Sequence, residues 1–169
     1  NGVSKGFAMT GWRVGYIGAP EFIASACNKI QGQITSATCS IAQKATQAAV
    51  LSKPEDSTNY MKIEFKKRRD LIVNQLSQIE GIKCNGPDGA FYVFPDISYF
   101  FDKKDENHSV IKNSYDLSMY LLYDAHVATV AGAAFGTNEC VRISYATSTK
   151  NITEATQRIK KSLEKLRWA

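Results

Sequence analysis

A long amphipathic stretch near the middle of the chain most constrains how these 169 residues fold. It opens at residues 52–55, where a Ser followed three positions later by Glu is typical of a helix N-terminus. Apolar residues then recur on one helical face up to Gly81, a residue typical of helix ends: Met61, Phe65, Ile72, Leu76 and Ile79. The pattern predicts one helix over 52–79. Because a helix of this length commonly bridges two domains, we expect a domain boundary near 52–59, between residues 1–54 and 55–169.

Shorter helices and strands alternate on both sides of this helix. Upstream, the sequence predicts a strand at 12–18 and helices at 20–31 and 41–51. Downstream, it predicts a helix at 115–126 and strands at 90–94, 127–130 and 141–145. A final helix is predicted to start at Asn151, with Glu154 as capping partner, and to bury Ile152, Ala155, Ile159, Leu163 and Leu166. This alternation is typical of the mixed α/β class.

The composition is that of an ordinary globular protein, with 44% hydrophobic and 22% charged residues. No apolar run approaches the length of a membrane span and no signal peptide is evident, so we expect no membrane partner. The chain opens on Asn1-Gly2-Val3-Ser4-Lys5, a turn-like string without an initiator Met. That start indicates a fragment of a longer protein.

The net charge of +5 and the sequence pI near 9.0 would suit an anionic ligand or nucleic acid. Much of the surplus lies at 66–69 and 160–167, inside helical patterns, where basic clusters are usually a solvated face. We therefore expect no nucleic-acid partner.

The cysteines and histidines are too widely spaced to predict a metal site: Cys27, Cys39, Cys84, Cys140, His108 and His126. Free thiols in a reducing cytosol are the simplest interpretation of the cysteines.

The start of the chain carries the most informative chemistry. Lys5 lies in a glycine-punctuated turn, eight residues before Arg13. In the predicted strand, Arg13 shares a face with Gly15, which leaves room beside the guanidinium. Two cations at one pocket suit a doubly charged anion such as a phosphate ester. From the spacing alone, an exposed turn lysine and a surface arginine remain the simpler interpretation.

The string S-K-G-F-A-M-T-G-W-R-V-G-Y at 4–16 resembles the cofactor-lysine signature of fold-type I, class I/II aminotransferases related to aspartate aminotransferase. The resemblance implies that Lys5 binds pyridoxal 5'-phosphate covalently and is the general acid/base of the proton shift. It implies that Arg13 binds the cofactor phosphate. It also implies that 1–54 end the cofactor-binding large domain, and that 55–169 form the interdomain helix and the α+β small domain.

A second match, far downstream, is the string V-R-I-S-Y-A at 141–146, which resembles the family's R-[IL]-S-[FY]-A strand. The resemblance implies that Arg142 binds the α-carboxylate of the amino-acid substrate. Strand alternation agrees, because residues 141, 143 and 145 would face a core and Arg142 the opposite side. For this segment alone, a surface arginine on a half-exposed strand would be the default.

Three further segments resemble the family less specifically. Residues 89–95 match a G-[AG]-F-Y-x-F strand, whose aromatic side chains we assign to the core rather than to the substrate. Residues 33–43 match a loop near the neighbouring subunit's cofactor, so Thr35 and Ser36 could serve the partner's site or simply cap a helix. Residues 132–136 match a P-G-x-x-F-G segment near the substrate, with Ala131 in place of the proline.

The resemblance implies an aminotransferase that moves an amino group between an amino acid, dicarboxylic or aromatic, and a 2-oxo acid such as 2-oxoglutarate. It implies a cytoplasmic homodimer. The partner of the pyridine nitrogen and the ring-stacking aromatic would lie upstream of Asn1, so we expect the isolated chain to be inactive. Two alternatives stay open: another fold-type I enzyme, such as a lyase or decarboxylase, and the cofactor-sensing domain of a transcription regulator.

Overall fold

The computed structural model of the chain describes residues 1–53 and 58–168. The chain forms two compact units, residues 1–62 and 63–169, and the division falls within the long central helix α4 (Thr58–Ser77). The domain boundary expected at residue 54 stays a prediction. Within the described residues, no helix combines the length and the apolarity that a membrane crossing requires.

Of the predicted capping pair at 52–55, Glu55 lies outside the described residues, as does Pro54. Ser52 itself closes the preceding helix, since its hydroxyl donates a hydrogen bond to the carbonyl of Ala49 at 2.6 Å. Gly81 is not the C-terminal cap of α4, which ends at Ser77. The glycine follows in a turn with φ 86°, where an added Cβ would lie 1.9 Å from the ring of Tyr99.

Unit 1 is helical. Its elements are α1 (Val3–Gly6), the 3-10 helix η1 (Thr10–Trp12), α2 (Glu21–Ile34) and α3 (Ser40–Leu51). The helices α2 and α3 confirm the predictions at 20–31 and 41–51. The strand predicted at 12–18 is wrong: Trp12 ends the 3-10 helix, and only Gly15 forms an isolated bridge, with Gly2. Local hydrogen bonds, such as that from the Trp12 amide to the Met9 carbonyl, replace the ladder of a strand.

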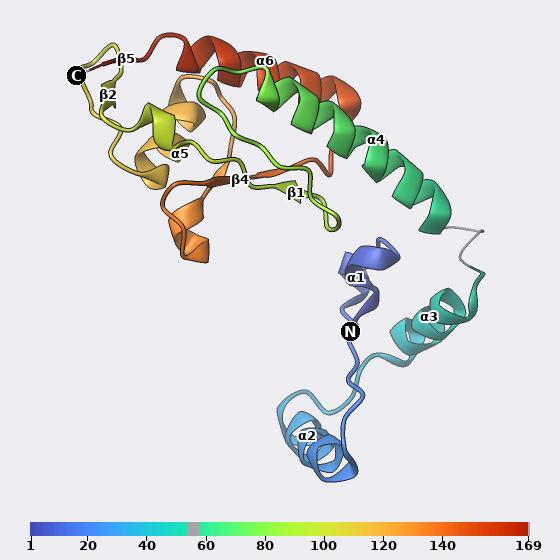
Figure 1. The fold of residues 1–169 in the computed structure, drawn as a ribbon. Coiled ribbons are helices and arrows are strands. Elements are labelled where there is room, and N and C mark those ends of the chain that lie inside the picture. The colour runs from blue at the N-terminus through green and yellow to red at the C-terminus, as the bar shows by residue number, and fades with distance from the viewer. Residues whose placement is uncertain (54–57, 169) are drawn as a thin grey trace. The chain divides into compact units, whose positions relative to one another are not determined.

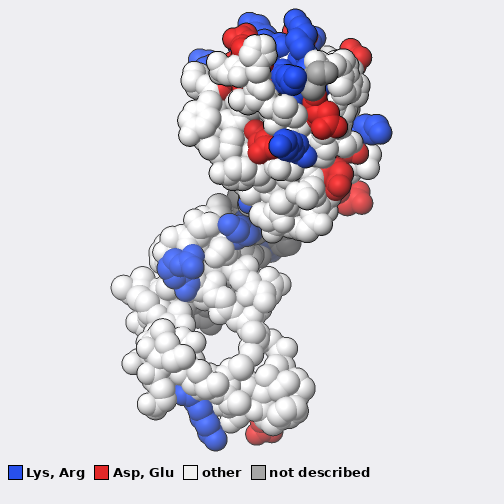
Figure 2. Space-filling model, turned by 90° about the vertical axis from the view of Figure 1, so that its left-hand side faces the viewer, with Lys and Arg blue, Asp and Glu red and all other residues white. Residues whose placement is uncertain are grey.

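Unit 1 has little core of its own. Among its described hydrophobic residues only Val3 and Ala42 are buried, and α2 buries none. Large apolar side chains of α2 face solvent, including Phe22 and Ile34. On the face drawn in Figure 2, charged side chains are sparser over unit 1 than over unit 2, where blue and red are interspersed.

Unit 2 is built on a three-stranded antiparallel sheet of order β1-β4-β3. The strands are β1 (Tyr92–Val93), β3 (Val130–Ala131) and β4 (Val141–Ser144), and a separate ribbon pairs β2 (Lys103–Lys104) with β5 (Arg167–Trp168). The strands predicted at 90–94 and 141–145 are confirmed, although they are shorter. The strand predicted at 127–130 begins only at Val130.

Two long helices, α4 and α6 (Thr149–Leu163), lie side by side in unit 2 (Figure 1). Gln75 of α4 joins them: its amide donates to the hydroxyl of Thr153 at 3.3 Å, and its carbonyl oxygen accepts from Thr156 at 2.8 Å. The predicted start of α6 at Asn151 is wrong. The helix begins two residues earlier because the Ser148 hydroxyl accepts the Asn151 amide at 3.1 Å and caps it.

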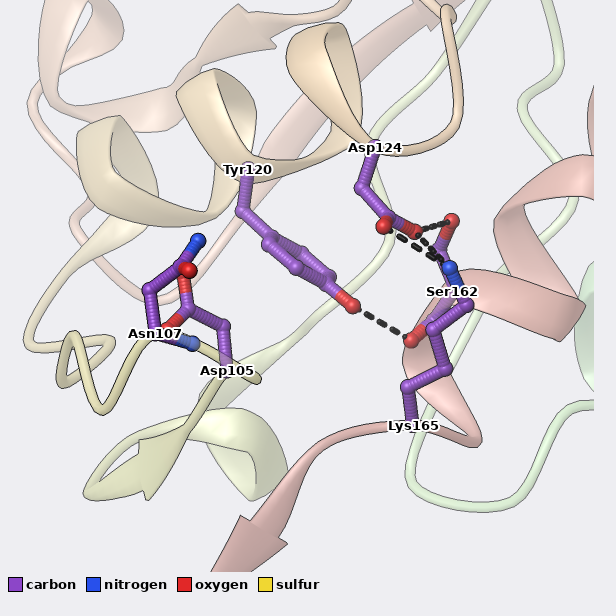
Figure 3. A network of polar contacts seen from close by, with 6 residues as sticks. All are labelled: Asp105, Asn107, Tyr120, Asp124, Ser162 and Lys165. Carbon is purple, nitrogen blue, oxygen red and sulfur yellow. Dashed lines mark hydrogen bonds and ion pairs between the residues drawn. The ribbon is translucent and has the colours of Figure 1, made fainter.

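The shorter helix α5 (Ser114–Tyr123) ends three residues before the predicted limit of 126. Its C-terminal end is tied to α6 by the polar network of Figure 3. The Tyr120 hydroxyl donates to the Ser162 carbonyl at 2.7 Å, the Ser162 hydroxyl donates to Asp124 at 2.5 Å, and Lys165 pairs with Asp124 at 2.8 Å. Two residues, Ser162 of α6 and Lys165 of its C-terminal extension, therefore hold the end of α5.

One hydrophobic core unites the helices and the sheet of unit 2. Its buried members come from α4, α5, α6, β1, β4 and their connections: Ile72, Leu76, Ile79, Ile82, Val93, Ile97, Phe100, Ile111, Leu117, Leu121, Ala125, Val141, Ile143, Tyr145, Ile152, Ile159, Leu163 and Leu166. The predicted burial is confirmed at Ile72 and Leu76 of α4 and at Ile79, which lies just beyond the end of the helix. On α6, Thr156 is buried where Ala155, predicted to be buried, is only partly covered.

Candidate functional site

Arg142 lies on the central strand of the unit 2 sheet. The neighbours Val141, Ile143 and Tyr145 are buried, with 1%, 8% and 2% of their surface exposed, whereas Arg142 is half-buried on the opposite face. This arrangement confirms the predicted alternation. It directs the guanidinium away from the core, to a face where a ligand can reach it.

Two aromatic rings flank the guanidinium. Its central carbon lies 4.5 Å from the ring centroid of Tyr92 and 4.4 Å from that of Phe135. Tyr92 comes from β1 and Phe135 from the segment that follows β3, so the rings reach Arg142 from the strands on its two sides. Within the described residues, no hydrogen bond or ion pair occupies the N–H groups of Arg142. A planar acceptor such as a carboxylate can take those donors.

The backbone around Phe135 is tightly built. Phe135 ends the 3-10 helix η4 (Gly132–Phe135), and Gly136 follows with φ 84°. A Cβ on Gly132 would lie 2.3 Å from the carbonyl oxygens of both Cys140 and Thr137. The rings of Phe94 and Phe135 pack edge to face, with their centroids 6.0 Å apart. These contacts fix where the Phe135 ring lies.

The assignment of all aromatic residues at 89–95 to the core is wrong in part. Phe91 packs against the core, but Tyr92 lies on Arg142 and Phe94 is 40% exposed. The signal that separates them is strand alternation: Phe91 and Val93 point inward, so their neighbours point to the Arg142 face. Sequence reasoning therefore missed Tyr92 and Phe135 as contacts of Arg142.

Lys5 and Arg13 lie in one closed loop of unit 1. The amide of Tyr16 donates to the Asn1 carbonyl at 2.8 Å, and the Asn1 amine donates to the Tyr16 carbonyl at 2.8 Å. Gly2 and Gly15 pair beside them, with an added Cβ on Gly2 only 3.3 Å from the Val14 carbonyl. Both predicted cofactor residues therefore belong to one loop whose two ends are joined. Arg142 belongs to the other unit, within which its site is described.

Arg13 adopts a left-handed backbone conformation, with φ 56° and ψ 46°. The prediction that it shares a strand face with Gly15 is therefore wrong, because no strand forms there. A non-glycine residue in this region costs about 1–2 kcal/mol, and such outliers often mark functional positions. One guanidinium nitrogen of Arg13 donates to the Thr10 carbonyl at 3.0 Å, and the side chain is otherwise exposed.

The chemistry of this loop fits pyridoxal phosphate. The cofactor has an aldehyde, which an amine can attack, and a phosphate, which a guanidinium fork binds well. Lys5 and Arg13 supply those two groups from exposed positions. Gly6 and Gly11 have open space around them, with nothing within 4 Å of an added Cβ. The backbone at these two glycines is therefore open to solvent.

The sequence also singled out Thr35, Ser36 and the four cysteines. Thr35 and Ser36 are exposed at the C-terminal end of α2, and Ser36 has φ 63°. All four cysteines are free thiols. Among residues 1–53 and 58–168, no group of three or more His, Cys, Asp or Glu side chains is arranged to hold a metal ion.

Comparison with known proteins identifies the family. The profile of the family "Aminotransferase class I and II" matches residues 1–159, which is nearly the whole chain. The chain belongs to this family. The membership agrees with the α/β fold class and with the motifs around Lys5 and Arg142, and members of the family depend on pyridoxal phosphate.

Several relatives are aspartate aminotransferases. The chain is 47% identical over 166 residues to a bifunctional aspartate aminotransferase and glutamate/aspartate-prephenate aminotransferase of Petunia hybrida, covering 96% of this chain and 34% of the relative. It is 44% identical to an aspartate aminotransferase of Pinus pinaster, covering 100% of this chain and 35% of that protein. The crystal structure of the aspartate aminotransferase from Rhizobium meliloti matches with a TM-score of 0.92 and 42% identity, over 99% of this chain and 42% of that one. The chain thus spans between a third and a half of the length of these relatives.

Proposed function

We propose that the chain is the C-terminal part of a pyridoxal-phosphate-dependent aminotransferase like aspartate aminotransferase. The observation that carries the proposal is the Arg142 guanidinium, flanked by Tyr92 and Phe135 and without a protein acceptor within the described residues. Amino acids and 2-oxo acids share one planar group, the carboxylate, and a guanidinium fork binds it bidentately. One arginine can therefore bind both substrates of an amino transfer.

The loop at 1–16 supplies the groups that the cofactor needs. Lys5 would hold pyridoxal phosphate through its aldehyde, and Arg13 would bind the phosphate through the N–H groups that Thr10 leaves unused. When bound, the cofactor supplies the electron sink that lets the Cα–H bond of an amino acid ionise. Lys5 would be the general acid/base of the reaction, its amine accepting the Cα proton of the substrate and giving it back.

The substrate preference follows from the relatives. The names of several relatives specify aspartate, and some add prephenate, so we propose a dicarboxylic or aromatic amino acid with 2-oxoglutarate as acceptor. We further propose a homodimer in the cytoplasm, in which the free thiols would stay reduced. Residues 1–54 would end the large domain and 55–169 would carry the interdomain helix and the small domain.

The role of Lys5 is tested by the visible spectrum of the full-length protein with pyridoxal phosphate. Lys5→Ala should abolish the absorption band of the covalently bound cofactor, because no amine remains to hold the aldehyde. Lys29→Ala, on the exposed helix α2, is the matched control and should leave the band unchanged. An unchanged band in Lys5→Ala would exclude the assignment.

The role of Arg142 is tested by steady-state kinetics of the same protein. Arg142→Lys should raise the substrate KM at least about tenfold while the cofactor still binds, because a point charge cannot replace the two-pronged contact. Loss of the cofactor with an unchanged KM would contradict the assignment.

Release of ammonia or CO₂ in place of a new amino acid would show a lyase or a decarboxylase instead of an aminotransferase.

A further inference from the structure

The guanidinium of Arg142 is held by rings rather than by a carboxylate. Arginine side chains in buried or half-buried positions are usually paired with an acid or hydrogen-bonded to backbone oxygens. Here the guanidinium carbon lies over the ring faces of Tyr92 and Phe135, 4.5 and 4.4 Å from their centroids. A ring face attracts a cation but takes none of the in-plane donors that a carboxylate would use.

Each ring is itself fixed from behind. Tyr92 faces Ser144 across the β1–β4 ladder, and its ring lies 4.5 Å from that of Phe91, which packs against the core. Phe135 lies against the edge of Phe94, in a turn with no space for a side chain on Gly132. These contacts orient both rings, although Phe135 keeps 47% of its surface exposed.

We infer that Tyr92 and Phe135 are positioning residues, which hold the Arg142 guanidinium so that its N–H edge is presented to a carboxylate ligand. The inference rests on the proposed function and deepens it. An arginine that is ordered before the ligand arrives loses less conformational entropy on binding, so its affinity for a carboxylate is higher. The rings also keep water from the faces of the guanidinium, which strengthens the contact made at its edge.

The test uses the full-length protein with its cofactor and measures succinate binding by calorimetry, together with kcat and KM. Tyr92→Leu and Phe135→Leu should each raise the Kd of succinate and the substrate KM about fivefold, with kcat changed less than about twofold. Tyr92→Phe retains the ring and should restore the affinity of the unmodified protein. Tyr123→Leu removes an exposed aromatic of α5 and should change neither constant.

A double-mutant cycle separates positioning from general loss of structure. In an Arg142→Lys background there is no fork to orient, so the leucine substitutions should change the succinate Kd less than about twofold. If the leucine substitutions weakened succinate binding equally in both backgrounds, or did not weaken it in the unmodified protein, the positioning inference would be overturned. The proposed function would still stand. If Arg142→Lys alone left succinate binding unchanged, the carboxylate role of Arg142 and the positioning role would both fail. Thermal unfolding of each variant, with Tm within a few degrees, shows that the fold is retained.

Discussion

Ala90 occupies a left-handed backbone conformation, with φ 62°, immediately before β1. Its carbonyl accepts a hydrogen bond from the buried Tyr145 hydroxyl at 3.0 Å, which fixes the turn from the core side. Like Arg13, it is a residue with a Cβ in a region that favours glycine. Ala90 lies beside the strand that carries Tyr92. A substitution by glycine at this position tests the backbone strain through the stability of the protein.

Ala90→Gly should raise the free energy of unfolding by about 1 kcal/mol, because glycine removes the left-handed penalty. Ala128→Gly, in a segment outside the left-handed region, should lower the free energy slightly through the larger backbone entropy of glycine in the unfolded chain. Urea denaturation of both variants measures the difference. A lower stability for Ala90→Gly than for Ala128→Gly would contradict the strain argument.

The turn η4 leaves no room for a side chain at Gly132. Gly132→Ala would place a methyl group against two backbone oxygens, which cannot move away as a flexible side chain would. We expect a loss of about 2–3 kcal/mol of stability, together with weaker carboxylate binding because Phe135 follows in the same turn. Ala134→Gly is the control within η4. Normal stability and normal succinate affinity in Gly132→Ala would show that the turn adjusts freely.

The contact between α5 and α6 is sensitive to acid. Hydrogen bonds from Lys165 and Ser162 lower the pKa of the Asp124 carboxyl below its ordinary value (Figure 3). Because the folded-state pKa is the lower one, the carboxylate stabilises the fold fully above the unfolded pKa, and that contribution is lost as the pH falls through the folded pKa.

The contribution of the Asp124 carboxylate to the free energy of unfolding is measured by urea denaturation between pH 7 and pH 3. Asp124→Asn should lower the stability by about 1 kcal/mol at pH 7, a modest value because the pair is partly solvent-screened. The variant should lose less stability than the unmodified protein below about pH 4. Asp88→Asn, at an exposed turn position, should leave the pH profile unaltered. Parallel profiles for the unmodified protein and Asp124→Asn would exclude the mechanism.

For the molecule as a whole, the two units differ in how much they bury. The core lies in unit 2, whereas α2 of unit 1 buries no residue. In the 169-residue chain, hydrogen exchange should therefore be slowest in α6 and in the C-terminal half of α4, and much faster in α2, because local opening there exposes no apolar surface. Protection of α2 equal to that of α6 would contradict this difference.

The sequence by itself determined the elements whose signal is local. Helix-start signals indicated α2 and α3, the spacing of apolar residues indicated α6 and the C-terminal half of α4, and alternation on β4 indicated the outward direction of Arg142. Helical and strand periodicity arise from backbone geometry over a few residues, so they can be followed along the chain without knowledge of the partner elements. The long motifs around Lys5 and Arg142 likewise indicated the family before the fold was known.

Only the tertiary structure decided the conformation of Arg13 and the surroundings of Arg142. The alternation at 12–18 resembled a strand, but a strand needs a partner, and pairing there is limited to Gly2 with Gly15. The rings of Tyr92 and Phe135 come from distant parts of the chain, and they meet Arg142 because the sheet order places β4 between β1 and β3. Strand order and register depend on long-range packing, which no local pattern encodes. The sequence thus predicted an arginine for a carboxylate, and the fold supplied the two rings that flank it.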